Sequence, residues 1–301
     1  MSSRLPFPQN CLVSYHYFKN YDMANLSRFT IIADSGAYSA KVHGLTIGVS
    51  DLCKWYTQWR SCFSWCAALD VIGDAAATKR NWEQMRDMGV DSVPTIHYPS
   101  PPSAIDYYAS RGATFIGLGG QVRIGQSSAM RWVISVMRYA RDRWPAVKFH
   151  GWGATGKLAL MLPYFSVDSS SWWSGRMWGH MKLFHPGDPF KTFDLVYDGK
   201  HVFSDPELCN VLSTFYGVDP ASVADSRGGA WAPVDLMSRS AAVLESHLRA
   251  RHGVIAPPPE LSGQTPGPRL HIVMPTEKNT LLRMAATLAE EQDALVARTG
   301  G

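Results

Sequence analysis

Hydrophobic and polar residues alternate in short and long segments through the first half of the chain. Short apolar runs predict seven β-strands, which cover residues 11–17, 29–35, 65–72, 92–98, 114–120, 147–153 and 165–170. Longer amphipathic segments predict helices near residues 50–62, 76–88, 102–111, 126–143 and 156–163. Strands that alternate with helices indicate βαβ units and a parallel sheet.

The number of strands favours a barrel over a doubly wound open sheet, which is the alternative. Seven strands before residue 171 suit a (β/α)8 TIM-like barrel whose eighth unit lies later in the chain. The segment RLHIVMP (269–275) is a candidate strand, and a helix is predicted from about residue 277 to 297. We therefore expect an α/β fold, a TIM-like barrel with an irregular C-terminal elaboration.

The chain divides into three predicted parts. Residues 1–175 form the main part of the barrel, and 176–268 form an insertion with a hairpin and a helix. The hairpin is predicted over residues 193–203, around Asp198-Gly199, because two β-rich runs flank that turn dipeptide. The helix of the insertion is expected at residues 234–252. Residues 269–301 supply a C-terminal strand and helix that pack on the barrel or close it.

Composition narrows the class of protein. The 301 residues are 46% hydrophobic, which is enough for a full core, and the net charge of +4 permits a polyanionic partner without requiring one. Five cysteines at irregular spacing argue against a disulfide framework and for a reducing compartment. The N-terminus lacks the apolar region of a signal peptide, and no segment is long enough to cross a bilayer. We expect a soluble cytoplasmic protein that needs no membrane.

Polar or glycine-rich residues recur where the predicted strands end. They are Asp34-Ser35-Gly36, Asp70, His97, Gly117–Gln121, His150–Gly153 and Asp168. In a barrel these ends converge on one face, where active sites are built. Asp168 alone, within FSVDSSSWWSG (165–175), is typical of a turn or a helix cap.

Several carboxylates at one barrel mouth favour glycosidic-bond chemistry. One ionised carboxylate attacks or stabilises the anomeric carbon, while another group exchanges a proton with the leaving group. Asp34, Asp70 and Asp168 are the candidates, and the pattern alone does not apportion their roles.

A series of motifs in chain order resembles the tRNA-guanine transglycosylase superfamily. The motifs span about residues 30–172 and are DSGAYS (34–39), ALDVIGD (68–74), TIHYP (95–99), FIGLGGQ (115–121), HGWGATG (150–156) and SVDSSSW (166–172). The resemblance implies that Asp168 is the nucleophile on the sugar C1′ and Asp34 the general acid/base. It also implies a base-binding set, which comprises Ser35, Asp70, His97, Gly117, Gly119 and Gly120. His97 stands where the family usually has Gln, and a core histidine is the alternative.

The chain is most similar to the phage and bacterial branch that exchanges guanine in DNA for a 7-deazaguanine. The tRNA enzymes carry a zinc site of three cysteines and a histidine after the nucleophile, whereas this chain has only Cys209 there. The resemblance therefore implies DNA and a free, preQ0-like 7-deazaguanine as partners, no cofactor, and a phage-encoded protein acting in the host cytoplasm. A tRNA-modifying enzyme and a non-catalytic barrel that binds nucleic acid or a base are the alternatives.

Aromatic and basic residues near the strand ends are candidates for nucleic-acid contacts. They are Trp172, Trp173, Arg123, Lys157, Arg176 and Lys182. Core packing of the tryptophans and solvated surface positions for the basic residues are the alternatives.

Overall fold

A computed structural model describes residues 5–121, 124–173, 180–196, 205–224 and 231–299. Its centre is an eight-stranded, entirely parallel sheet in the order β3-β2-β1-β10-β7-β6-β5-β4. The strands are β1 (Asn10–Ser14), β2 (Thr30–Asp34), β3 (Phe63–Cys66), β4 (Thr95–His97), β5 (Phe115–Gly119), β6 (Lys148–Gly151), β7 (Ser166–Ser169) and β10 (Arg269–Val273). Seven of them lie within a predicted strand or overlap it closely, whereas β3 begins before the predicted strand 65–72 and shares only residues 65–66 with it. Strand β10 provides the eighth strand, between β1 and β7.

The sheet is curled into a half-barrel that does not close completely. Its edge strands β3 and β4 meet only beyond the end of β3, at one isolated parallel bridge between Ala67 and Val93. There the Val93 N–H donates to the Cys66 carbonyl and the Ala68 N–H donates to the Val93 carbonyl, both at 2.8 Å. We refer to this junction between β3 and β4 as the seam. The α/β class and the parallel sheet are thus confirmed, whereas a continuous barrel ladder is not formed.

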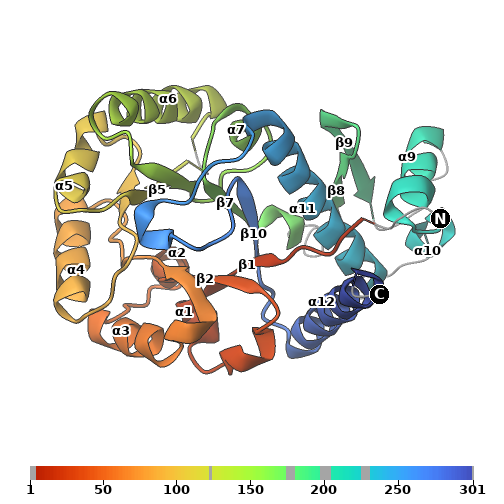
Figure 1. The fold of residues 1–301 in the computed structure, drawn as a ribbon, viewed down its shortest axis with the longest axis horizontal. Helices are drawn as coiled ribbons and strands as arrows, with labels where there is room; N and C mark the ends of the chain where they lie inside the picture. Colours follow the sequence, from red (N-terminus) through yellow and green to blue (C-terminus); the bar gives the residue numbers. More distant parts are fainter. Residues whose placement is uncertain (1–4, 122–123, 174–179, 197–204, 225–230, 300–301) are drawn as a thin grey trace.

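Helices cover the outer face of the sheet (Figure 1). They are α3 (Val49–Gln58), α4 (Ala75–Asp87), α5 (Asp106–Ala109) with the preceding 3-10 turn η3 (Pro102–Ile105), α6 (Gln126–Arg143) and α7 (Gly156–Met161). All five match predicted helices. The pattern did not predict the short α1 (Tyr15–Phe18), η1 (Met23–Leu26) and α2 (Ala37–Val42), whereas η2 (Arg60–Cys62) lies within the helix predicted at residues 50–62. Such short elements give little helical periodicity.

Strand residues alternate between two separate apolar clusters. On β1 and β2, Val13 and Ile31 belong to the large cluster beneath the helices, whereas Leu12 and Ile32 belong to a smaller one. The smaller cluster also contains Trp65, Phe115 and Phe165, so it fills the concave interior of the sheet. Because side chains alternate with period two, every second residue of a strand faces this interior.

The C-terminal part adds a hairpin and several helices beside the sheet. They are β8 (His180–His185), β9 (Asp188–Val196), α9 (Pro206–Val211), the π-helical turn η5 (Leu212–Tyr216), α10 (Pro220–Ala224), α11 (Trp231–His252), the 3-10 turn η6 (Pro259–Leu261) and α12 (Lys278–Thr299). The two long helices match the predictions. The first arm of the predicted hairpin, residues 193–196, belongs to β9 and pairs with β8. The predicted turn and second arm lie outside the described residues.

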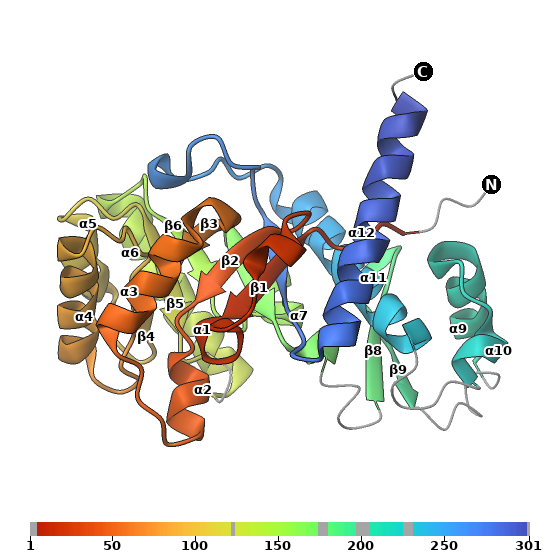
Figure 2. The same cartoon turned by 90° about the horizontal axis from the view of Figure 1, so that it is seen from below.

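Helix α11 connects this part to the sheet. It packs against β8, β10 and α7, and so it is buried on most sides rather than along one stripe. Helix α12 projects away from the sheet (Figure 2). No helix among the described residues has both the length and the apolar character needed to span a membrane. All five cysteines are described, and none of them forms a disulfide bond.

A buried arginine ties α11 to α12 and to the N-terminal segment. The Arg239 side chain is fully buried, and its Nε donates to both carboxylate oxygens of Asp235, at 3.1 and 3.2 Å. Its Nη2 lies 2.6 Å from Glu291 Oε1, and its Nη1 donates to the Leu5 carbonyl. Such a cluster is expensive to break, because removal of one partner leaves a buried charge uncompensated.

We expect Arg239→Met to lower the free energy of unfolding by about 3–5 kcal/mol, because Asp235 loses the cation that compensates its burial. Urea denaturation measures the change. Arg249→Met is the matched control, since Arg249 forms the same i, i+4 pair with Glu245 on α11 but is 44% exposed. That control should cost less than about 1 kcal/mol. Equal losses in the two variants would contradict this interpretation.

Candidate functional site

The acidic residues predicted for the site come together at the carboxyl ends of the strands. Asp34 ends β2, Asp168 lies in β7, and Asp70 follows β3. Ile32 faces the interior, so Asp34, two residues farther along β2, faces it as well. Val167 faces the helices, so its neighbour Asp168 on β7 faces the interior. Both Asp70 and Asp168 act electrostatically on Asp34. The structure thus brings the three carboxylates into one site.

Asp168 has one carboxylate oxygen held and the other unbound. Its Oδ1 accepts hydrogen bonds from the Gly153 N–H at 2.7 Å and from His150 Nε2 at 3.3 Å. None of the described residues donates a hydrogen bond to Oδ2. The side chain is 11% exposed, so the carboxylate is largely buried but still reaches solvent. A carboxylate held by one oxygen presents the other in a fixed direction.

His150 is a site residue that the sequence analysis grouped with a strand end but did not select. It lies on β6 with its imidazole in the interior, where its ring contacts Trp65 and Trp152 edge-on. Burial lowers its pKa, which favours the neutral ring. Its second nitrogen, Nδ1, is 2.8 Å from Ser166 Oγ. His150 and Ser166 could both have been found from the sequence as polar side chains at interior-facing positions of buried strands.

Asp34 is the carboxyl group whose protonation is most changed by its surroundings. Burial and the nearby Asp70 and Asp168 raise its pKa from 3.8 to about 7. The Gly36 N–H, which donates to Asp34 Oδ2 at 2.9 Å, acts in the opposite direction. So does the adjacent Ser14 hydroxyl, although it makes no hydrogen bond of normal geometry to a described residue. Near neutral pH, Asp34 therefore holds or releases a proton with little cost, as a general acid/base requires.

Ser35, Asp70 and His97 form one connected chain. His97 Nε2 lies 2.7 Å from Asp70 Oδ2, and Ser35 Oγ lies 3.5 Å from Asp70 Oδ1. His97 is on β4 and Asp70 follows β3, so this contact spans the seam. His97 is partly exposed and bound to a site carboxylate, which argues against a purely core histidine. Any base that binds Asp70 shares that carboxylate with His97.

The glycines of β5 make room for neighbouring side chains. A Cβ on Gly119 would lie 2.7 Å from the His97 ring, and one on Gly117 would collide with the Trp152 indole. Gly120 has a φ of +76°, which a side chain rarely allows. The structure gives Gly117 and Gly119 a packing role beside the site, whatever contact their backbone makes with a base.

The residues proposed for nucleic-acid contact fall into three groups. Trp172 is buried, with its Nε1 donating to the Val273 carbonyl at 3.1 Å, and Trp173 packs against it. Trp172 thus belongs to the core, whereas Trp173 is partly exposed at the edge of the core. Lys157 is exposed at the start of α7, and Lys182 is exposed on β8. Arg123 and Arg176 lie outside the described residues.

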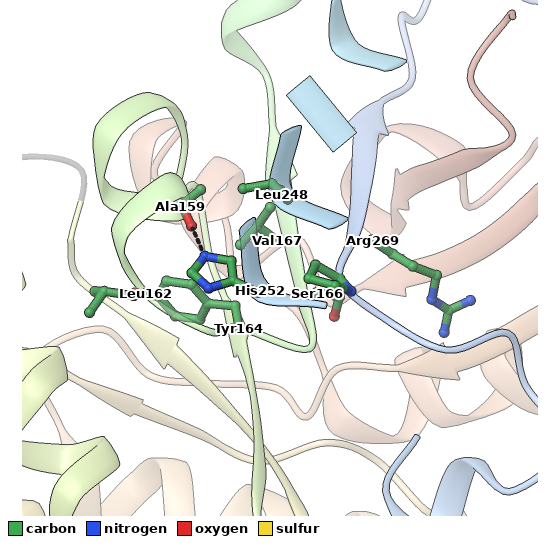
Figure 3. Close-up of a pocket in the computed structure, with 9 residues that line it drawn as sticks. Ala159, Leu162, Tyr164, Ser166, Val167, Leu248, His252 and Arg269 are labelled. Carbon is green, nitrogen blue, oxygen red and sulfur yellow. Dashed lines mark hydrogen bonds between the residues drawn. The ribbon is translucent and has the colours of Figure 1, made fainter. Parts of the chain in front are cut away.

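Two cavities of the structure lie away from the three carboxylates. One of about 550 Å³ lies at the amino ends of β3, β4 and β5, and its walls include Trp65, Trp82 and Phe115. A small pocket lies beneath α7 and α11, where His252 approaches the Ala159 carbonyl at 3.3 Å (Figure 3).

The described side chains of the site can be compared with the ligand sets that hold metal ions. Within the described ranges, no three His, Cys, Asp or Glu side chains gather so that they could hold a metal ion. Asp168 and Asp70 instead have hydrogen-bond donors as neighbours. The site therefore combines carboxylates with proton donors.

Comparison with known proteins does not identify a relative. The chain matches none of the models of known protein families, and no curated protein matches it either.

Asp34→Asn should stabilise the protein at neutral pH and above. Since the folded pKa of Asp34 is raised, its effect on stability is most favourable below about pH 4 and is lost as pH rises towards 7. Asparagine removes the buried charge. We expect a gain of about 1–2 kcal/mol at pH 8, discounted for partial solvent exposure, and almost none at pH 4.5.

Thermal unfolding at pH 4.5, 6 and 8 tests this dependence. Asp142→Asn is the control, because Asp142 pairs with Arg141 on an exposed face of α6. The control should show a small difference at all three pH values. A pH-independent effect of Asp34→Asn would refute the electrostatic explanation.

Proposed function

We propose that this protein exchanges guanine in DNA for a 7-deazaguanine base through a covalent bond between Asp168 and the deoxyribose C1′. The observation that carries the proposal is the pairing of two differently prepared carboxyl groups at one end of a parallel sheet. Asp168 offers an oxygen, Oδ2, to which no described residue donates, and burial with nearby carboxylates raises the pKa of Asp34 to about 7. Two carboxyl groups with separated roles are the pattern of glycosidic-bond enzymes.

The curled sheet is consistent with this function. We infer that it is a (β/α)8-type barrel with a weakened junction at the seam, because β10 supplies the eighth strand and helices cover the outer face. Barrel enzymes build their sites from residues at the carboxyl ends of several strands. Asp34, Asp70, His97 and Asp168 come from β2, the segment after β3, β4 and β7.

The exchange consists of two displacements at C1′. In the first, a lone pair of Asp168 Oδ2 forms a bond to C1′ while the bond from C1′ to guanine breaks, and the departing base takes the proton of Asp34. In the second, the incoming base gives a proton to Asp34 and bonds to C1′, while the electron pair of the C1′–Oδ2 bond returns to Asp168. Asp34 is thus acid first and base second.

Asp70, with Ser35 and His97 beside it, is suited to hydrogen-bond the edge of a guanine-like base. A guanine inside a duplex has to leave the stack to reach this site, which costs a few kcal/mol. The preference for DNA over tRNA is supported by the sequence after Asp168, which contains Cys209 as its only cysteine and so lacks the ligand set of the tRNA enzymes.

We expect Asp168→Asn to abolish covalent capture of DNA and to reduce base exchange by at least about 10³-fold, because the amide is a poor nucleophile. Purified protein is incubated with labelled guanine or 7-deazaguanine and with duplex DNA, single-stranded DNA or tRNA. Denaturing gels detect the adduct, and mass spectrometry of nucleosides detects the new base. Asp142→Asn is the matched control and should retain full activity.

Each outcome of that experiment distinguishes the alternatives. Incorporation into tRNA alone would replace the DNA substrate by tRNA. A fully active Asp168→Asn variant would exclude the nucleophilic role. Binding of nucleic acid by the wild type without an adduct or exchange would leave only a binding function.

Adduct formation should follow the protonation of Asp34. Since guanine departs with the proton of Asp34, the rate of adduct formation should decrease as pH rises through about 7. Rapid-quench measurements from pH 5.5 to 8.5 determine the profile. In Asp34→Asn the rate should be about 10²- to 10⁴-fold lower and should lack this descent. Persistence of the same descent in the variant would assign it to another group.

A further inference from the structure

We propose that His150 is a positioning residue that fixes the Asp168 carboxylate and helps it to leave in the second half of the exchange. The inference rests on the proposed function and adds a residue to it. It starts from the asymmetry of Asp168, whose Oδ1 accepts from Gly153 and His150 while no described residue donates to Oδ2.

The hydrogen bonds around His150 assign one tautomer. The Asp168 carboxylate only accepts, so the proton of the neutral ring is on Nε2. Nδ1 is then an acceptor, and the hydroxyl of Ser166, at 2.8 Å, donates to it. Ser166 is fully buried and lies opposite His150 in the register of β6 and β7. The relay therefore runs from Ser166 through His150 to Asp168.

The imidazole is held rigidly in this orientation. Trp152 and Trp65 contact it edge-on, with ring centroids at 4.3 and 4.9 Å, and its side chain has no exposed surface. His271 and Phe115 lie farther out, with ring centroids at 6.3 and 6.4 Å. Because the ring is enclosed, its N–H points to Asp168 Oδ1 before substrate binds.

The hydrogen bonds to Asp168 Oδ1 have opposite effects on the two displacements. Once Oδ2 bonds to C1′, Oδ1 becomes the carbonyl oxygen of the ester and carries less negative charge. When the incoming base displaces Asp168, the electron pair of the C1′–Oδ2 bond returns and the charge spreads again to Oδ1. The N–H groups of His150 and Gly153 bind the carboxylate more strongly than the ester. They therefore accelerate the second displacement and moderate the first.

Three variants separate this role from simple packing. His150→Leu removes the donor, and His150→Gln retains an amide N–H at about the reach of Nε2. Ser166→Ala removes only the hydroxyl that fixes the tautomer. Rapid mixing of each protein with labelled DNA gives the rate of adduct formation, and a chase with unlabelled 7-deazaguanine gives the rate of adduct resolution.

We expect His150→Leu to resolve the adduct about 10- to 100-fold more slowly than the wild type, so that the adduct accumulates. His150→Gln should resolve it within a few-fold of the wild-type rate. The rate of adduct resolution in Ser166→Ala should lie between those of the two His150 variants. If His150→Leu does not fold, Ser166→Ala tests the role of His150 in its place. Thermal unfolding of each variant provides the control for packing.

The possible failures have different causes. Wild-type protein that forms no adduct would overturn the proposed function and this inference with it. A normal adduct in the wild type, with unchanged resolution in His150→Leu and Ser166→Ala, would overturn only the role of His150. Equal slowing of both displacements in His150→Leu and His150→Gln would likewise reduce His150 to a packing residue.

Discussion

The register of the parallel sheet is the constraint on which the candidate site depends. Side chains alternate along each strand, so a carboxylate reaches the interior only if its strand pairs in the observed register. In that register Ser14 lies beside Asp34, and His271 lies beside Asp168. A shift of one residue would turn Asp168 towards the helices and bring Val167 into the interior. Ladder pairing and the two apolar clusters thus determine where the acids lie.

The same register concentrates negative charge, and the site is organised to accommodate it. Asp168 accepts hydrogen bonds and Asp70 contacts His97, whereas burial and the two nearby carboxylates raise the pKa of Asp34 to about 7. Like charges in a confined site favour the protonated form of a carboxyl group among them. The carboxyl group that is electrostatically least favourable for the fold is therefore the one best prepared to transfer a proton. Burial of Asp34 thus lowers the stability of the fold at the position where the proposed reaction needs a proton donor and acceptor.

The sequence predicted the elements better than the contacts of the site. Buried strands and α6 have clear periods, so their positions follow from local patterning. The resemblance selected Asp34 and Asp168, but the partners of Asp168 come from another strand. His150 and Ser166 are 16 residues apart and meet only through the register of β6 and β7. The pairing of β9 with β8 was missed for the same reason, since pairing is a tertiary property.

The seam has a mechanical consequence for the site. Each other pair of neighbouring strands shares a ladder, whereas β3 and β4 are joined by one bridge, and regions with few hydrogen bonds open at the lowest free-energy cost. Asp70 and His97 face each other across this compliant junction. Separation of the two strands would widen the space between them without disturbing β7, which carries Asp168. The half-barrel therefore combines a more easily opened side, which carries Asp70 and His97, with a more firmly paired side, which carries Asp168.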